Sequence, residues 1–176
     1  EGLDVSVTEG ETIQSCGIDF QILEIPGHTL DHIAYFAADT SQPRLFCGDT
    51  LFSAGCGRVF EGTAQQMYAS LEKLKVLPSN TLVYCAHEYT LANLKFAQVV
   101  EPQNLQISAH IEVCEQQRNN DLPTLPNTLE AEKKINPFLR CAEVELRESL
   151  VDQMNNALTA SDVEVFQYLR AWKDSF

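Results

Sequence analysis

FQILEIPGHTLDHIAYFAA, residues 20–38, decides how the chain folds, because two apolar runs flank one short turn-like segment. The run Phe20–Ile25 stops at Pro26-Gly27, and His32–Ala38 forms the second apolar run. Short apolar runs bounded by Pro and Gly are typical of β-strands. The sequence therefore predicts two strands joined by a segment that contains His28.

The pattern continues with further strands and one helix. Arg44–Cys47 is a third apolar run, and Thr81–Cys85 is a fourth. Between them, the apolar residues of Thr63–Leu77 recur at helical spacing. This β-β-β-α-β order predicts an α/β fold in which helices cover a sheet.

The second half of the chain has mainly helical periodicity. Thr63 with Gln66, and Ser161 with Glu164, match capping boxes that begin two of the helices. We place a domain boundary at Tyr89, which gives one domain at residues 1–89 and a helical domain at residues 90–176. The predicted helices of the second domain are one through Leu91, Leu94 and Val99, then Leu105–Gln117, Glu143–Asn156 and Ser161–Trp172, with a Pro-broken connection at Asp121–Pro126.

Composition limits the class of partner. The 176 residues are 44% hydrophobic, enough for a packed core, but no apolar run approaches the ~20 residues of a membrane span. The net charge of -13 argues against nucleic acid and against an anionic membrane surface, since both need a basic face. Solubility explains most of the acidity. A small anionic ligand is compatible if the twelve Lys and Arg are locally concentrated.

The six cysteines show no Cys-x2-Cys pair of a zinc or redox motif. Six thiols are compatible with disulfides in a secreted chain. Cys47 and Cys85 lie inside apolar runs, however, which favours small buried thiols in a reducing cytoplasm. The chain begins at Glu1 with neither a signal peptide nor an initiator Met, so we expect a processed or truncated polypeptide.

Polar residues follow three of the predicted strands at equivalent positions. His28, Asp49 and His87 each lie just beyond a strand, where a rigid sheet lets loop side chains converge. Two imidazoles and a carboxylate suit Zn, Fe or Mn better than Ca or Mg, and an Asp can bridge two metals. Each residue alone is more typical of a surface loop, and Gly48-Asp49 of a turn. These residues alone leave both readings open.

Longer motifs resemble glyoxalase II, a family of the metallo-β-lactamase superfamily. They are PGHTLDH (26–32), GDTLF (48–52), CGRVFEGT (56–63), CAHEYT (85–90), KINPFLR (134–140) and LRAWKD (169–174). The first two are shared across the superfamily, and the others are more specific to glyoxalase II. The resemblance implies the second part of an αββα metallo-β-lactamase sandwich, followed by an all-α C-terminal domain.

The resemblance also implies two divalent metal ions, zinc first, with iron and manganese as alternatives. By position, Asp49 would bridge the ions, His28 would bind one and His87 the other. His32 would support the ligands or be an ordinary buried histidine. The family's Thr-His-x-His-x-Asp-His motif, which supplies the other four of seven ligands, does not occur in the sequence and would precede Glu1.

The implied activity is thioester hydrolysis. S-D-lactoylglutathione would be split into D-lactate and glutathione by a metal-bridging hydroxide, as a step of methylglyoxal detoxification. The resemblance implies that the partner is a glutathione thioester, and we expect a monomeric cytoplasmic enzyme. The implied substrate-binding residues are Arg58, Phe60, Tyr89, Arg170 and Lys173. Arg170 and Lys173 share one helix face, although basic residues are also common at a solvated helix C-terminus.

Two alternatives remain. The first is another enzyme of the superfamily, such as a persulfide dioxygenase or a lactonase. The second is a non-catalytic fragment that folds, or swaps into a partner, without a complete metal site. Metal analysis discriminates the second, since a paired site holds about two ions per chain and a fragment holds well under one.

Overall fold

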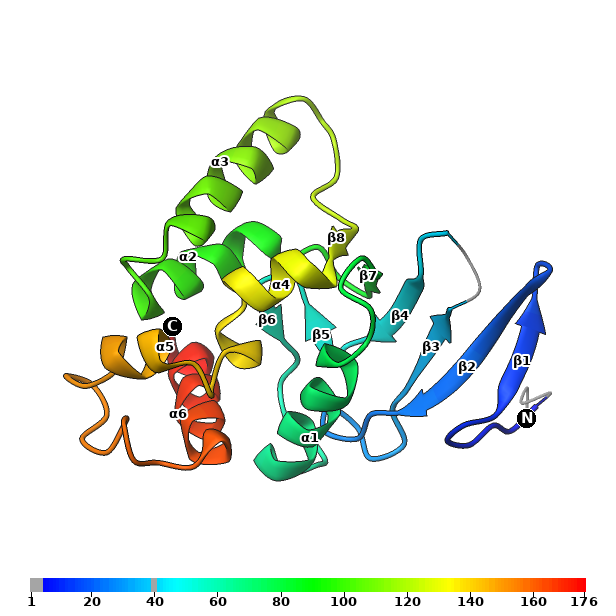
Figure 1. Cartoon of the computed structure of the whole chain (residues 1–176), viewed down its shortest axis with the longest axis horizontal. Helices are drawn as coiled ribbons and strands as arrows, with labels where there is room; N and C mark the ends of the chain where they lie inside the picture. The colour runs from blue at the N-terminus through cyan, green and yellow to red at the C-terminus, as the bar shows by residue number, and fades with distance from the viewer. Residues whose placement is uncertain (1–4, 39–40) are drawn as a thin grey trace.

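The computed structural model describes residues 5–38 and 41–176 as a mixed sheet with helices gathered toward one end of it (Figure 1). The six-stranded sheet has the order β1-β2-β3-β4-β7-β8, in which only the β4–β7 pair is parallel. The elements are β1 (Thr12–Ser15), β2 (Ile18–Glu24), β3 (Ile33–Ala37), β4 (Arg44–Gly48), β5 (Leu51–Phe52), β6 (Gly55–Cys56), α1 (Ala64–Lys75), β7 (Leu82–Cys85), α2 (Thr90–Val100), α3 (Leu105–Asn119), β8 (Asn127–Thr128), α4 (Leu129–Ile135), the 3-10 helix η1 (Pro137–Leu139), α5 (Val144–Ser149) and α6 (Asp162–Ser175).

The four predicted strands are confirmed as β2, β3, β4 and β7, and the α/β class is confirmed with them. The sequence did not predict β1, the β5–β6 hairpin or β8. β1 is a short, polar and mostly exposed edge strand, and the other three have only two residues each. Such segments carry too little apolar periodicity to be recognised.

Helix α1 covers one face of the sheet and fixes the turn that follows β2. Met67, Leu71 and Leu74 are fully buried in the same core cluster as strand residues of β3, β4 and β7. Complete burial of one such side chain contributes about 1.5–3 kcal/mol. The Ser70 hydroxyl donates to the Pro26 carbonyl at 2.8 Å. The helix therefore holds the Pro26 turn against the sheet.

Gly27 allows the close approach between this turn and α1. Its φ is +155°, and a Cβ there would lie 2.8 Å from the Met67 Cα.

The predicted capping box of α1 is present: the Thr63 side chain accepts from the Gln66 N–H, and the Gln66 side chain accepts from the Thr63 N–H. Capping satisfies the first free N–H groups of the helix and fixes where it begins.

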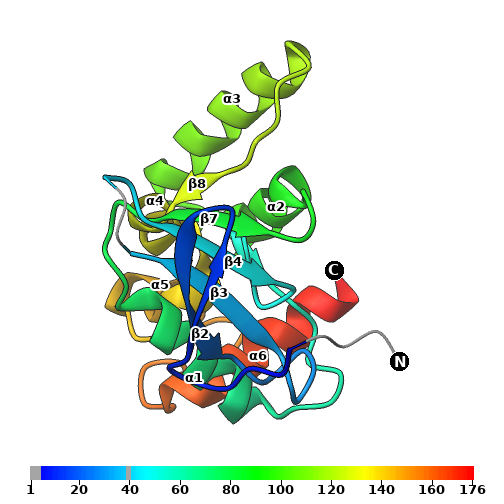
Figure 2. The same ribbon diagram turned by 90° about the vertical axis from the view of Figure 1, so that its right-hand side faces the viewer.

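The helical part of the chain shares the core of the sheet. Phe138, Phe166 and Leu169 are fully buried in the cluster that includes Leu71. Strand β8 also joins the sheet beside β7, so the second half of the chain is helical except for one short strand. Helix α3 extends beyond the rest of the molecule in both views (Figures 1 and 2). The domain boundary at residue 89 remains a prediction.

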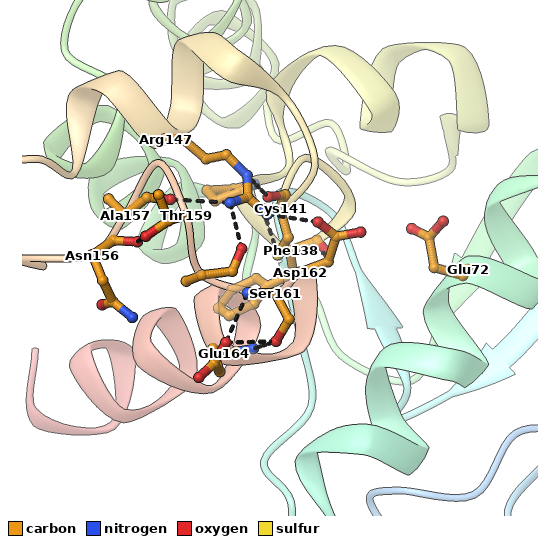
Figure 3. A network of polar contacts seen from close by, with 12 residues as sticks. Glu72, Phe138, Cys141, Arg147, Asn156, Ala157, Thr159, Ser161, Asp162 and Glu164 are labelled. Atoms are coloured by element: carbon orange, nitrogen blue, oxygen red, sulfur yellow. Dashed lines mark hydrogen bonds and ion pairs between the residues drawn. The ribbon is translucent and has the colours of Figure 1, made fainter.

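The helix predicted for Glu143–Asn156 is wrong beyond Ser149, where α5 ends. Beyond Ser149 the backbone forms turns, and the Arg147 guanidinium binds carbonyls on both sides of α5 (Figure 3). Its Nε donates to the Cys141 carbonyl at 2.9 Å, and Nη1 donates to the Ala157 and Ala160 carbonyls at 3.0 and 2.7 Å. Two of these carbonyls belong to the connection that leads to α6, so Arg147 stabilises that connection.

The other three predicted helices of this half correspond to α2, α3 and α6, and the Ser161–Glu164 capping box is present. All six cysteines are free; Cys47 is buried and Cys85 is half-buried.

No helix within residues 5–38 and 41–176 combines the length and apolarity that crossing a membrane requires.

Candidate metal and substrate site

Three loops bring His28, Asp49 and His87 together at one end of β2, β4 and β7. Asp49 lies between the two imidazoles: its Oδ2 is 3.7 Å from Nε2 of His28, and its Oδ1 is 3.3 Å from Nε2 of His87. Each carboxylate oxygen thus faces a different histidine. The side chains are 18%, 28% and 51% exposed for His28, Asp49 and His87, so the group opens to solvent on the His87 side.

The orientation of His28 is fixed by the next loop. Its Nδ1 donates to the Arg58 carbonyl at 2.9 Å, which leaves the Nε2 lone pair directed toward Asp49. A carbonyl behind the imidazole is the usual way to set the tautomer of a metal-binding histidine. Gly57 permits the contact, because a Cβ at this position would lie 1.8 Å from the Asp49 carbonyl oxygen.

His32 lies beneath the Asp49 loop with both ring nitrogens engaged. Its Nε2 accepts from the Asp49 N–H at 3.0 Å, and its Nδ1 faces the Thr29 hydroxyl at 3.3 Å. Burial, together with the neighbouring His28, lowers the pKa of His32 and favours the neutral ring that accepts this bond. Gly48, at φ +52°, is needed here, since a Cβ would lie 2.5 Å from the His32 Nε2.

Aromatic rings border the polar group. The His87 ring stacks on Tyr89, with centroids 5.1 Å apart and an interplanar angle of 23°. The Phe60 ring lies 5.0 Å from that of His28, and Phe52 lies 6.1 Å from that of His87. Phe60 and Tyr89 are 67% and 50% exposed, so both keep much of their surface open to solvent beside the polar group.

The donor set fits a divalent metal only in part. Within residues 5–38 and 41–176, no three His, Cys, Asp or Glu side chains form a cluster that would hold an ion by itself. Two imidazole nitrogens directed toward the two oxygens of one carboxylate nevertheless match the ligand types that Zn, Fe and Mn take. The arrangement is an open, incomplete set of ligands centred on Asp49.

A cavity of about 560 Å³ opens from these residues. It is lined by every candidate metal-binding or substrate-binding residue named in the sequence analysis except His32. These are His28, Asp49, Arg58, Phe60, His87, Tyr89, Arg170 and Lys173. The cavity draws on both halves of the chain. Five further lining residues were not predicted, namely Phe52, Cys56, Gly57, Ala92 and Asn93.

Arg170 is only 8% exposed, and its hydrogen bonds go to the protein. Nη1 donates to the Cys56 carbonyl at 2.9 Å, and Nη2 donates to Oδ1 of Asp174 at 2.9 Å. The same Asp174 oxygen lies 3.4 Å from Nε of Arg58. Arg170 and Asp174 therefore join α6 to the loop that carries Arg58. The spacing of Arg170 and Asp174, four residues apart on one helix, was a signal for this pair.

Lys173 and Arg58 are the cations that open onto the cavity. The ammonium of Lys173 lies 3.5 Å from the Ala92 carbonyl and 5.2 Å from the centroid of the Phe96 ring. Burial lowers the pKa of Lys173, and the charge of Arg170 lowers it further. The side chain of Arg58 is 63% exposed. Both cations can meet a carboxylate that enters from solvent.

Glu132 is a buried residue that the sequence reasoning missed. Its carboxylate accepts from the Ser53 hydroxyl and the Ala54 N–H, both at 2.8 Å, and from Asn127 at 2.7 Å. Asn136 also donates to it at 3.2 Å. Glu132 thereby holds the β5–β6 turn, which lies between Asp49 and Arg58 in the chain. No local sequence signal marks a carboxylate for burial.

Comparison with known proteins gives two family matches that together span nearly the whole chain. Residues 2–87 match the metallo-β-lactamase superfamily, and residues 88–176 match the hydroxyacylglutathione hydrolase C-terminus. The chain is also similar to solved structures. It aligns with ETHE1 from Myxococcus xanthus at 26% identity and a TM-score of 0.54, over 99% of this chain and 61% of that one.

A metallo-β-lactamase from Staphylococcus aureus aligns at 20% identity and a TM-score of 0.53, over 95% of this chain and 42% of that one, which supports the fold alone. Curated relatives named hydroxyacylglutathione hydrolase are much more similar in sequence. The protein from Pseudomonas syringae pv. syringae is 47% identical over 98% of this chain, which spans 66% of that protein's length. The protein from Photobacterium profundum is 47% identical, over 99% of this chain and 67% of the relative. The chain therefore belongs to the hydroxyacylglutathione hydrolase family of the metallo-β-lactamase superfamily.

Proposed function

We propose that this chain forms the larger part of a hydroxyacylglutathione hydrolase, which splits S-D-lactoylglutathione into D-lactate and glutathione in the detoxification of methylglyoxal. The observation that carries the proposal is the position of Asp49 between His28 and His87, in one cavity with Arg58 and Lys173. Metal-type donors and cations that suit an anionic thioester thus share one space.

We propose that His28, Asp49 and His87 hold two divalent ions, zinc first, with iron and manganese as alternatives. When bound, such ions polarise a carbonyl and lower the pKa of a water toward ~7. Asp49 supports the pair because its two oxygens face different histidines. His28 is kept in the required tautomer by the Arg58 carbonyl, and His32 holds the Asp49 backbone.

Substrate binding is assigned to the rim of the cavity. Arg58 and Lys173 bind a glutathione carboxylate, and the exposed rings of Phe60 and Tyr89 contact the apolar parts of the substrate. Exposed ion pairs contribute only ~0.2–1 kcal/mol each, so several contacts act together. Arg170 contributes by holding the Cys56 carbonyl, and through it the loop of Arg58.

We further propose that residues 1–89 form the metal-binding part and residues 90–176 the substrate-binding part of a cytoplasmic monomer. Six unpaired cysteines support a reducing compartment. Another activity of the superfamily is not favoured, because the relatives that match 98% of the chain at 47–49% identity are named hydroxyacylglutathione hydrolase.

Hydrolysis assays on two preparations test the proposal. One is this chain alone, and the other is this chain fused behind the preceding third of the Pseudomonas syringae relative, each with zinc, iron or manganese added. Activity in either preparation supports the proposal. Activity in the fusion alone also identifies the isolated chain as a folded part without a complete site. No thioester hydrolysis by either metal-loaded protein would refute it.

A further inference from the structure

A second cavity, of about 310 Å³, adjoins the first one. Both cavities are lined by Tyr89 and Ala92. The second continues past Tyr89 toward the end of α3 and is also lined by Glu88, Leu91, Arg118 and Thr124. Because the Tyr89 ring stacks on the His87 ring, this second cavity begins one aromatic ring away from the proposed metal ligands. The two cavities are therefore neighbours at Tyr89 and Ala92.

The second cavity carries one group of each charge. Nη1 of Arg118 lies 4.0 Å from Oε1 of Glu88, and the two side chains are 44% and 37% exposed. Each is held in place by the connection that follows α3. Arg118 donates to the Leu122 carbonyl at 2.9 Å. Glu88 Oε1 accepts from the Thr124 N–H at 2.9 Å and from the Thr124 hydroxyl at 2.8 Å.

The pair retains hydrogen-bonding capacity that the protein does not use. Within the part of the chain that the structure describes, Oε2 of Glu88 and Nη2 of Arg118 have no hydrogen bond to protein. A carboxylate can accept at both oxygens, and a guanidinium can offer two parallel donors to a carboxylate. The pair can therefore bind an anion and a cation side by side without giving up its internal bonds.

We propose that this second cavity binds the γ-glutamyl end of a glutathione thioester, with Arg118 on its α-carboxylate and Glu88 on its α-ammonium. The inference rests on the proposed function. Glutathione carries two carboxylates, and Arg58 and Lys173 account for one of them. The other stands beside an ammonium on the same carbon, which matches an arginine and a glutamate 4.0 Å apart. An extended tripeptide spans ~10 Å, which suits a groove running through two adjoining cavities.

Conservative variants separate the two charges. Glu88→Gln keeps an amide oxygen to accept from Thr124 but removes the negative charge. Arg118→Gln removes the positive charge. Lys134→Gln is the control, since this surface lysine pairs with Glu130 and lines neither cavity of the groove. Thermal unfolding of each variant checks that the fold is retained. All variants are made in the preparation that hydrolyses the thioester.

Calorimetric titration uses S-hexylglutathione, a thioether that is not hydrolysed, and two analogues of it. One analogue has 4-aminobutyryl in place of γ-glutamyl and so lacks the α-carboxylate; the other has glutaryl and lacks the ammonium. Arg118→Gln is expected to weaken binding of S-hexylglutathione and of the glutaryl analogue roughly two- to fivefold, and to leave the 4-aminobutyryl analogue unchanged. Glu88→Gln should weaken S-hexylglutathione and the 4-aminobutyryl analogue, and leave the glutaryl analogue unchanged.

Equal effects of Arg118→Gln on all three ligands, or no effect on any of them, would overturn the second subsite while leaving the hydrolase intact. An effect of Lys134→Gln as large as that of Arg118→Gln would overturn it too, because the loss of one positive charge anywhere on the protein would then explain the weaker binding. If no preparation hydrolyses the thioester or binds S-hexylglutathione, the proposed function itself fails, and the subsite with it.

Discussion

Asp49 is the residue on which the candidate metal site depends, because each of its oxygens faces a different imidazole. In the hydrolysing preparation, Asp49→Ala should abolish turnover and reduce bound metal. His28→Ala should retain more metal, since a terminal ligand serves one ion and a bridging carboxylate serves two. Elemental analysis and kcat on the same samples provide the test. An Asp49→Ala protein that stays fully metallated and active would remove Asp49 from the bridge.

Lys173 and Arg170 are neighbours in sequence with different surroundings, and we expect different phenotypes. Lys173→Ala should raise KM for glutathione thioesters and leave kcat nearly unchanged, because its contact is remote from the thioester carbonyl. Arg170→Ala should lower the melting temperature, because the Cys56 carbonyl and Asp174 lose a buried donor. Steady-state kinetics and thermal unfolding separate the two. Equal KM effects with unchanged stability would contradict this division.

Lys173 also introduces a pH dependence. Burial, and then Arg170, lower the pKa of the ammonium, so its charge is lost at a lower pH than in a free lysine. KM should therefore rise with pH on the alkaline side, and this rise should be absent in Lys173→Ala.

The sequence predicted which residues lie together at the site better than it predicted how buried each side chain is and what it contacts. His28, Asp49 and His87 could be placed together because each follows a strand of one sheet. The burial of Arg170 could not be predicted, since helical spacing defines a face but not the carbonyl of Cys56 that meets it.

Among the elements, the β5–β6 turn depends on groups from helices that follow it in the chain. Asn93 of α2 donates to the Ser53 carbonyl, Asn136 donates to the Phe52 and Gly55 carbonyls, and Glu132 of α4 accepts from Ser53 and Ala54. The turn separates Asp49 from Arg58, so these contacts set the spacing of the site.

Glu132 makes this turn sensitive to pH. Burial raises the pKa of its carboxyl, and hydrogen bonds, first from the Ala54 N–H and Ser53, offset this only in part. A raised folded-state pKa contributes stability that is complete below the unfolded value of ~4.5 and is lost as pH rises through the folded value. Glu132→Gln should be less stable, because its amide NH2 meets donors. Since Gln does not titrate, the difference in free energy of unfolding between the parent protein and the variant should narrow as pH rises above ~4.5. Denaturant unfolding across this range tests it, and a gap that widens would contradict it.

Arg147 holds the irregular segment between α5 and α6 (Figure 3). Arg147→Met should cost about 2 kcal/mol or more, because three carbonyls lose a donor and Asp162 loses its partner at 2.6 Å. Asp162→Asn is the matched control, since it removes the charge that pairs with Arg147 but keeps the three carbonyl contacts, and it should cost less. Urea unfolding measures both, and equal losses would mean that the carbonyl contacts contribute little.

Element prediction succeeded where periodicity and caps agreed. α1 and α6 begin where their capping boxes predict, at Thr63 and Ser161. The irregular connection after α5 was missed because Arg147 stabilises it through contacts with residues 10 and 13 positions away. β8 was missed because two polar residues join the sheet only through their pairing with β7.

For the molecule as a whole, a strongly acidic protein presents a cavity with cations on its rim. The net charge is -13, yet Arg58, Arg170 and Lys173 all line the cavity of Asp49. Local concentration of cations would offset the general repulsion of the anionic substrate proposed above. The sheet and the helices share one hydrophobic core, which holds the cations of the cavity and the candidate metal ligands in a fixed relative position. The fold class followed from the strand and helix order, and the family resemblance was confirmed by the matched relatives.

The convergence of His28, Asp49 and His87 on metal is tested most directly by a crystal structure of the hydrolysing preparation with zinc, with data collected at the zinc absorption edge. Anomalous peaks are expected at ~2.0–2.2 Å from Nε2 of His28, a carboxylate oxygen of Asp49 and Nε2 of His87. Zinc bound elsewhere, with these three side chains arranged as they are here and no peak between them, would contradict it.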